Sequence, residues 1–186
     1  MAAKVTYKID MVEVFNRAYS DLDMEVRSQL RPLLSDPTVK EVYGREVISK
    51  IVKNTRANRD KDGDPMGKYS KAYIKSTIFK IYKAGQTKVN LTLTGEMLAS
   101  MQAIYRPSGR NITIDFVDQL NNDKAHGQIY KNKYNFLGLP KDEEEQILRK
   151  IINDASEQGL LGNLDISISA QIGRQNVDIG GGDNES

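Results

Sequence analysis

Residues 126–151 read HGQIYKNKYNFLGLPKDEEEQILRKI, and this stretch contains the clearest change of pattern in the chain. It begins at the only histidine, His126, and passes through the apolar turn Phe136-Leu137-Gly138-Leu139-Pro140. Acidic residues follow, and acids at the start of a helix are stabilising because they lie at the positive end of its dipole. The apolar residues after them recur at helical spacing, so the stretch predicts a loop, a turn and a helix from about Lys141 to Ala155.

Two amphipathic helices are predicted nearer the start of the chain. Apolar residues recur at three- and four-residue spacing over 12–33, which predicts one helix of about twenty residues that ends between Pro32 and Pro37. A second helix is predicted over about 39–58.

Strands are predicted in the second half of the chain. Residues 103–106 and 112–117 read as two strands, and the turn-rich link between them predicts a hairpin. Residues 89–94 also alternate like a strand, with Thr94 as a candidate N-cap for a following helix. Residues 118–133 read as a polar excursion, whereas 69–81 fits no single pattern.

Together these elements predict an α/β (α+β) fold with a small, mainly antiparallel sheet flanked by helices. We expect an N-terminal pair of helices over 1–58, an α/β core over 59–157, and a C-terminal strand and flexible tail over 158–186. The last segment contains Leu164, Ile166 and Ile168 alternating with Asp and Ser, which predicts a strand with one apolar face. A chain of 186 residues is long enough to bury a core without covalent staples.

The composition excludes several classes of protein. The absence of cysteine excludes a disulfide framework, a thiolate nucleophile and a Cys-based metal site. No apolar run approaches the roughly 18 residues that a spanning helix needs. Charges interrupt the apolar N-terminal stretch, which argues against a signal peptide. We therefore expect a soluble protein with no membrane partner.

Charge is distributed unevenly along the chain. Residues 40–88 contain thirteen Lys or Arg against five Asp or Glu, whereas residues 141–186 contain four against ten. Such asymmetry suits contact between opposite charges, on a second subunit or on a nucleic acid. Two solvated faces would explain the same counts.

Two groups of residues are candidates for a metal site or for catalysis. Asp60, Asp62 and Asp64 are spaced as in a calcium loop, but Pro65 and Lys71 stand where an EF-hand needs Gly and Glu, so a tight solvated turn is the preferred explanation.

His126 has Asp115, Asp118 and Asp123 nearby in sequence but no nucleophile motif, so a positioning or interface role is the alternative to a catalytic triad. We expect no catalytic, cofactor-binding or metal-binding residues, and no enzymatic activity.

Lysines interleave with aromatic residues over 68–88. Phosphate contacts from lysine and base stacking on tyrosine would suit sequence-independent binding of nucleic acid. The same pattern fits half-buried rings beside lysines whose aliphatic stems lie along them.

Three segments, in order along the chain, resemble the virion-morphogenesis or tail-completion proteins of tailed phages. Residues 62–70 (DGDPMGKYS), with Tyr73 and Lys75 after them, resemble the family's acid-Gly-x-Pro loop and the segment that follows it. Residues 91–98 (LTLTGEML) are similar to its Leu-x-x-Thr-Gly-x-Leu/Met turn. His126, the turn at 136–139 and the acidic helix resemble its ending, although Tyr134-Asn135 replaces the usual Arg-Pro and Met66 replaces a frequent Trp.

The resemblance implies a structural protein without a cofactor, located in the virion neck or tail and assembled in the host cytoplasm. Such a subunit forms a ring of six or twelve copies that completes or terminates the tail or builds the neck. Its neighbours would be neck, connector and tail-tube proteins, with passive contact to DNA in the ring lumen. The alternative is a nucleic-acid-binding accessory protein that uses the basic region 40–88.

Within such a ring, we expect ten residues to form interfaces or to position loops. They are Lys83, Lys88, His126, Tyr130, Phe136, Leu137, Leu139, Leu164, Ile166 and Ile168. We further expect the acidic start of the helix at 141 to meet the basic 40–88 surface of a neighbour.

Overall fold

The computed structural model describes residues 3–82, 86–91 and 95–157, and their fold is the expected mixture of helices and a small antiparallel sheet. Strands β1 (Tyr7–Asp10), β2 (Met101–Tyr105) and β3 (Asn111–Phe116) lie in the order β1-β3-β2. The hairpin of β2 and β3 is confirmed. Strand β1 was not predicted, and it brings the start of the chain into the same sheet as residues 101–116.

The two long helices predicted from apolar spacing are confirmed as α3 (Pro37–Arg56) and α8 (Lys141–Glu157). Asp36 caps α3, because its carboxylate accepts hydrogen bonds from the backbone of Thr38 and Val39.

The single helix predicted over 12–33 is wrong. The chain instead forms α1 (Met11–Ala18), α2 (Met24–Leu30) and a 3₁₀ turn (Arg31–Ser35), because the polar residues Ser20, Asp21 and Asp23 favour a turn. The apolar periodicity misled because it continues across the break, where Tyr19 and Leu22 are both buried.

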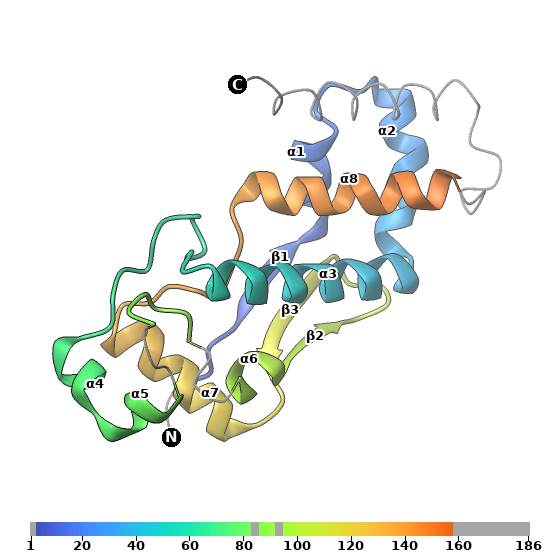
Figure 1. The fold of residues 1–186 in the computed structure, drawn as a ribbon. Coiled ribbons are helices and arrows are strands. Elements are labelled where there is room, and N and C mark those ends of the chain that lie inside the picture. Colours follow the sequence, from blue (N-terminus) through green and yellow to red (C-terminus); the bar gives the residue numbers. More distant parts are fainter. Residues whose placement is uncertain (1–2, 83–85, 92–94, 158–186) are drawn as a thin grey trace, which may run out of the picture.

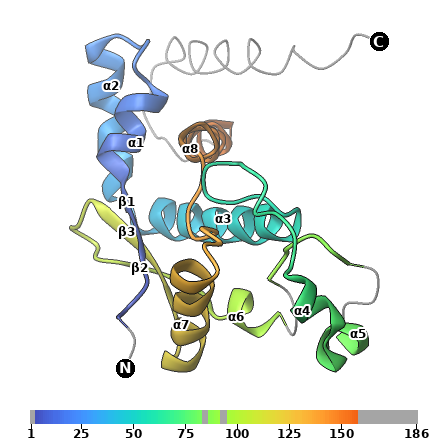
Figure 2. The same cartoon turned by 90° about the vertical axis from the view of Figure 1, so that its left-hand side faces the viewer.

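Helix α3 lies between the sheet and α8, and α1 packs against α8 (Figures 1 and 2). The short helices α4 (Lys71–Lys75) and α5 (Thr77–Tyr82) lie at one end of the molecule, and α1 and α2 lie at the other. Among the described residues, no helix is long and apolar enough to cross a membrane.

Helix α3 approaches the sheet very closely at Gly44. A Cβ atom added at Gly44 would lie 2.5 Å from the Cβ of Ala103 in β2. One turn earlier, the fully buried Lys40 donates from Nζ to the carbonyls of Arg106 and Pro107, at 3.3 and 2.6 Å. A glycine and a lysine therefore fix α3 on the β2–β3 hairpin.

The polar excursion predicted over 118–133 is also wrong, because these residues are largely helical. They form α7 (Gln119–His126) and a π-helical turn (Gly127–Lys131). Asp118 caps α7, and its hydrogen bonds from Asn121 hold the pKa of Asp118 below its ordinary value.

The strand predicted over 89–94 does not form at residues 89–91; the preceding residue, Lys88, forms an isolated bridge with Lys68. The next helix, α6 (Glu96–Ala99), is capped by Gly95, whose φ of 78° suits glycine. The predicted cap Thr94 and the predicted C-terminal strand lie outside the described residues.

Candidate functional site

The turn after the π-helical segment packs against the aspartate-rich loop that follows α3. Lys61 donates from its backbone to the carbonyl of Asn135 at 2.8 Å, and a Cβ added at Gly138 would lie 3.0 Å from the Cβ of Lys61. The start of the first segment of the family resemblance, directly after Lys61, therefore lies beside the turn of the third, although Lys61 and Asn135 are 74 positions apart along the chain.

The aspartate loop is closed by its own backbone. Asp60 accepts hydrogen bonds from the backbone N–H groups of Asp62 and Asp64, both at 2.9 Å, which is an Asx-type turn. Over the part of the chain that the structure describes, no three His, Cys, Asp or Glu side chains are grouped so that they could hold a metal ion.

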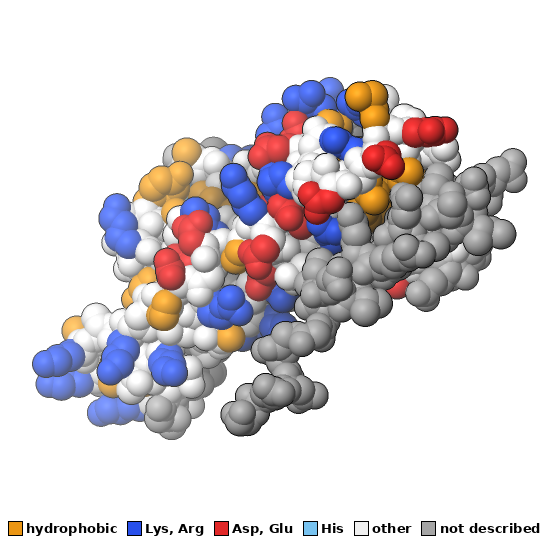
Figure 3. Space-filling view, turned by 90° about the horizontal axis from the view of Figure 1, so that it is seen from above, with side chains coloured by type: hydrophobic (Ala, Val, Ile, Leu, Met, Phe, Trp, Pro, Cys, Tyr) orange, Lys and Arg blue, Asp and Glu red, His pale blue; other side chains and the backbone are white. Residues whose placement is uncertain are grey.

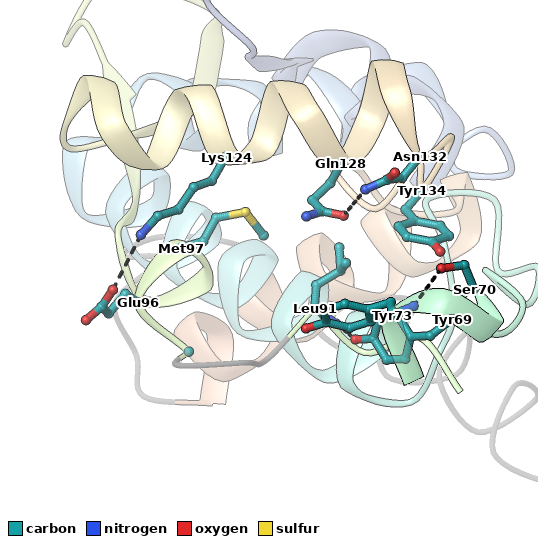
Figure 4. A pocket seen from close by; sticks show the side chains of 11 residues that line it. Tyr69, Ser70, Tyr73, Leu91, Glu96, Met97, Lys124, Gln128, Asn132 and Tyr134 are labelled. Carbon is teal, nitrogen blue, oxygen red and sulfur yellow. Dashed lines mark hydrogen bonds and ion pairs between the residues drawn. The ribbon is translucent and has the colours of Figure 1, made fainter. Parts of the chain in front are cut away.

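A groove of about 530 Å³ lies between the α4 end of the molecule and the α7 segment (Figure 4). Its walls come from the first two segments of the resemblance and from the chain just before the turn of the third. The lining residues are Tyr69, Ser70 and Tyr73 from the first, Leu91, Gly95, Glu96 and Met97 from the second, and Lys124, Gln128, Asn132 and Tyr134 from around the third.

The groove is aromatic and amide-lined, with little net charge. Lys124, the one lysine among the described lining residues, lies 3.4 Å from the carboxylate of Glu96, and the amide of Asn132 donates to Gln128 at 2.9 Å. Burial raises the pKa of the Tyr73 hydroxyl, and the neighbouring Tyr69 adds to that effect. Such a lining suits a neutral polypeptide segment better than a phosphate backbone.

The sequence analysis did not identify the groove residues of the π-helical turn that follows α7. Gln128 and Asn132 are four residues apart, which places them on one helix face, but that spacing is informative only once the segment is known to be helical.

The acidic start of α8 forms a second cluster, and it is buried. Glu143 accepts a hydrogen bond from Asn54 at 2.6 Å and lies 3.4 Å from the ammonium of Lys50 and 3.8 Å from the guanidinium of Arg59. Two of the basic residues of the 40–88 region therefore pair with α8 of the same chain.

Glu144 is held by partners from the start of the chain. The guanidinium of Arg17 lies 2.6 Å from the carboxylate of Glu144 and 2.9 Å from that of Glu145. The hydroxyl of Tyr7 also donates a hydrogen bond to Glu144. Burial raises the pKa of Glu144 above its ordinary value, against the opposing hydrogen bonds from Tyr7 and Arg17. Burial and the bond to Glu144 also raise the pKa of Tyr7.

These pairs correct the expectation that the acidic helix start meets a neighbouring subunit. Glu143 and Glu144 are only 6% and 7% exposed, and their charges are balanced within the chain. Glu143 and Glu144 fix α8 against α1 and α3, whereas Asp142 is exposed and Glu145 is partly buried. The partners of the cluster come from distant positions, so the acidic run alone could not reveal it.

The predicted interface residues of the turn at 136–139 lie in the core. Phe136 is 1% exposed, and Leu137 and Leu139 are each 7% exposed. The rings of His126 and Tyr130 stack with centroids 4.4 Å apart, one helical turn from each other, and Tyr130 is 56% exposed.

The three aspartates considered as partners of His126 bond elsewhere. Asp115 pairs with Lys4, Asp118 caps α7, and Asp123 accepts a hydrogen bond from Gln119. The triad hypothesis therefore has no geometric support.

Of the other predicted interface residues, Lys88 is exposed and pairs through its backbone with Lys68. Lys83, Leu164, Ile166 and Ile168 lie outside the described residues.

The basic region 40–88 does not form one surface. Lys40 is buried, Lys50 and Arg59 pair with Glu143, and Lys61 pairs with Asp62. Positive side chains gather instead at the end that holds α4 and α5, as Figure 3 shows. The rings of Tyr69, Tyr73 and Phe79 lie there with centroids 5.2 to 5.6 Å apart, so they pack on one another.

Comparisons of the chain with models of protein families, with curated proteins and with solved structures give no match. Any functional assignment therefore depends on the residues and geometry described above.

Proposed function

We propose that the chain is a structural subunit of a tailed-phage virion that assembles into a ring at the head–tail junction. In that position it completes or terminates the tail or builds the neck. The proposal extends the resemblance of the three sequence segments to the family, and it assigns the chain no catalytic role.

The observation that supports the proposal is the convergence of the first two segments with the chain that leads into the third. Residues 62–70 and 91–98 are separated in sequence, yet both contribute to the same groove, and its remaining wall comes from Lys124, Gln128, Asn132 and Tyr134, which precede the turn at 136–139. Segments that only stabilise the core would be buried and would not line a common, partly open surface. A shared surface is what a subunit contact requires.

The exposed face of α5 supports an assembly role. Ile78 and Ile81 are 53% and 68% exposed, and they lie in a stretch that contains four lysines and no acid from Lys68 to Tyr82. Apolar side chains rimmed by charge on a projecting element are typical of protein contact sites. A ring needs two different surfaces on each subunit, and this end of the molecule provides one of them.

Particle mass and shape test the proposal. Light scattering on the purified chain is expected to give six or twelve times the 20.9 kDa of one chain, and negative-stain images are expected to show closed rings. Ile81→Ser should lower the ring fraction, whereas the matched variant Ile81→Leu should preserve it. A chain that stays monomeric at every concentration, with both variants unchanged, contradicts the proposal.

A second candidate is a nucleic-acid-binding accessory protein. It is favoured by Lys71, Lys75 and Lys80, which are exposed and, within the described residues, form no ion pair. Mobility shift of duplex DNA across a salt series tests it. Binding by a monomer that persists at physiological salt would favour this function over the ring.

A further inference from the structure

Strand β2 has an open edge. Val117 donates from its backbone to the carbonyl of Ser100 at 2.9 Å, so these two residues form a hydrogen-bonded pair next to Met101 and Phe116. Bonded and non-bonded pairs alternate in an antiparallel ladder. Gln102 and Ile104 therefore bond β3, whereas the other three residues of β2 direct their N–H and C=O groups away from the sheet.

Nothing in the described part of the chain pairs with those groups. No backbone hydrogen bond reaches the outer side of β2 from residues 3–82, 86–91 or 95–157. The strand reads MQAIY and contains no charge and no proline, although sheet edges are usually protected by one or the other. The opposite edge differs, because β1 contains Lys8 and Asp10 and lies beside the turn at Gly138.

Helix α3 provides an apolar wall beside this edge. Gly44 contacts Ala103 of β2, and Ile48 and Val52 follow Gly44 at four-residue intervals on the same side of the helix. Both are only partly buried against the core. A strand added next to β2 could therefore cover one face with them, while its other face would adjoin Ile104, which is 45% exposed.

We propose that residues 164–172 of a second copy of this chain add to β2 as a fourth, edge strand. The sequence LDISISAQI alternates apolar and polar residues, as a strand with one buried face requires. Its isoleucines cover Ile48 and Val52, and its polar residues line the open face beside Ile104. Main-chain hydrogen bonds to a free edge provide the affinity.

The length of the chain beyond α8 suits this exchange. Residues 158–163 form a spacer that spans at most about 20 Å when extended. The nine residues after it extend about 30 Å as a strand, which more than covers the five residues of β2. Head-to-tail exchange of this kind links each copy to the next, and ring closure by it rests on the proposed function.

The absence of cysteine allows a direct crosslinking test on the full-length chain. A tagged variant with Ile104→Cys is mixed with an untagged variant that has one cysteine at position 165, 166, 167 or 168. Disulfides are then allowed to form between the two variants. Facing residues of adjacent strands have the separation that a disulfide needs. We expect roughly ten-fold more mixed dimer with Asp165→Cys and Ser167→Cys than with Ile166→Cys and Ile168→Cys.

A chain with both Ile104→Cys and Ser167→Cys identifies the occupant. A ladder of covalent multimers supports exchange between copies. A crosslinked monomer shows that the segment covers β2 of its own chain, which overturns the proposal. The proposal is also overturned if crosslinking occurs equally at all four positions, or if no crosslink forms.

Light scattering of the same variants under reducing conditions separates this inference from the proposed function. Rings that form without specific crosslinks leave the ring assignment intact and overturn strand exchange. Specific crosslinks in open chains, without rings, support strand exchange and contradict the ring.

Discussion

The substitution Gly44→Ala tests how closely α3 packs on the sheet. In an ordinary helix interior this change is stabilising, by about 1 kcal/mol, because alanine has the higher helix propensity. Here the added methyl group would lie 2.5 Å from the Cβ of Ala103, whereas carbon atoms in contact are separated by about 3.5 to 4.0 Å. The helix and strand must therefore separate by about 1 Å.

The expected magnitude follows from these two opposing effects. Overpacking of a tight core contact costs about 1 to 3 kcal/mol, and it involves the backbone here because neither small side chain can move aside. After subtraction of the gain in propensity, we expect Gly44→Ala to lower the free energy of unfolding by about 0 to 2 kcal/mol, instead of raising it. For a protein of this size the melting temperature should fall by up to roughly 8 °C.

Urea unfolding monitored by circular dichroism measures the effect. Ser49→Ala is the control, because Ser49 is exposed on the same helix and its replacement should be neutral or slightly stabilising. Adding Ala103→Gly to Gly44→Ala should recover stability through a coupling of about 1 kcal/mol or more. If Gly44→Ala is as stabilising as Ser49→Ala, the close approach of α3 to β2 is refuted.

Three further predictions concern side chains whose roles emerged from the fold. Lys40→Met should lower the free energy of unfolding by about 1.5 to 3 kcal/mol, because two hairpin carbonyls lose a charged donor, whereas Lys53→Met on the exposed side of α3 should change it by less than about 0.5 kcal/mol in urea titrations. Burial raises the pKa of Glu144, so the folded state binds more protons than the unfolded state just above pH 4.5. The free energy of unfolding of the native protein should therefore exceed that of Glu144→Gln by the full difference below that pH. This difference should shrink as the pH rises through the folded pKa. An advantage that grows with pH in thermal melts would show that the ion pair outweighs burial. His126→Ala should lower stability by about 0.5 to 1.5 kcal/mol through loss of the stack on Tyr130, and it should leave particle mass by light scattering unchanged.

Elements with strong local patterns were predictable from sequence. The helices α3 and α8 and the β2–β3 hairpin each combine the right periodicity with recognisable ends, so their own residues specify them. Strand β1 is four residues long, which is too short for an alternation of apolar and polar residues to be recognised in the sequence. It forms because β3 provides its hydrogen-bonding partner. The N-terminal break was missed because the buried residues on both sides keep one helical period across it.

The charged residues show where sequence reasoning about the site fails. A run of glutamates or a lysine on a helix usually faces water, and here Glu143, Glu144 and Lys40 are all buried. Burial of a charge is tolerated only with specific partners, and these partners are Arg17, Asn54 and the hairpin carbonyls. The residues next to each charged side chain in the sequence do not indicate which distant residue is its partner.

The sequence by itself determined the fold class, the long helices α3 and α8 and the β2–β3 hairpin, because each depends on residues close together in the chain. Only the tertiary structure decided that Tyr69, Met97 and Tyr134 line one groove, that Glu143 and Glu144 are paired within the chain, and that no described residue bonds the outer edge of β2. Each of these properties depends on which distant groups meet, and that is set by how the helices and the sheet pack.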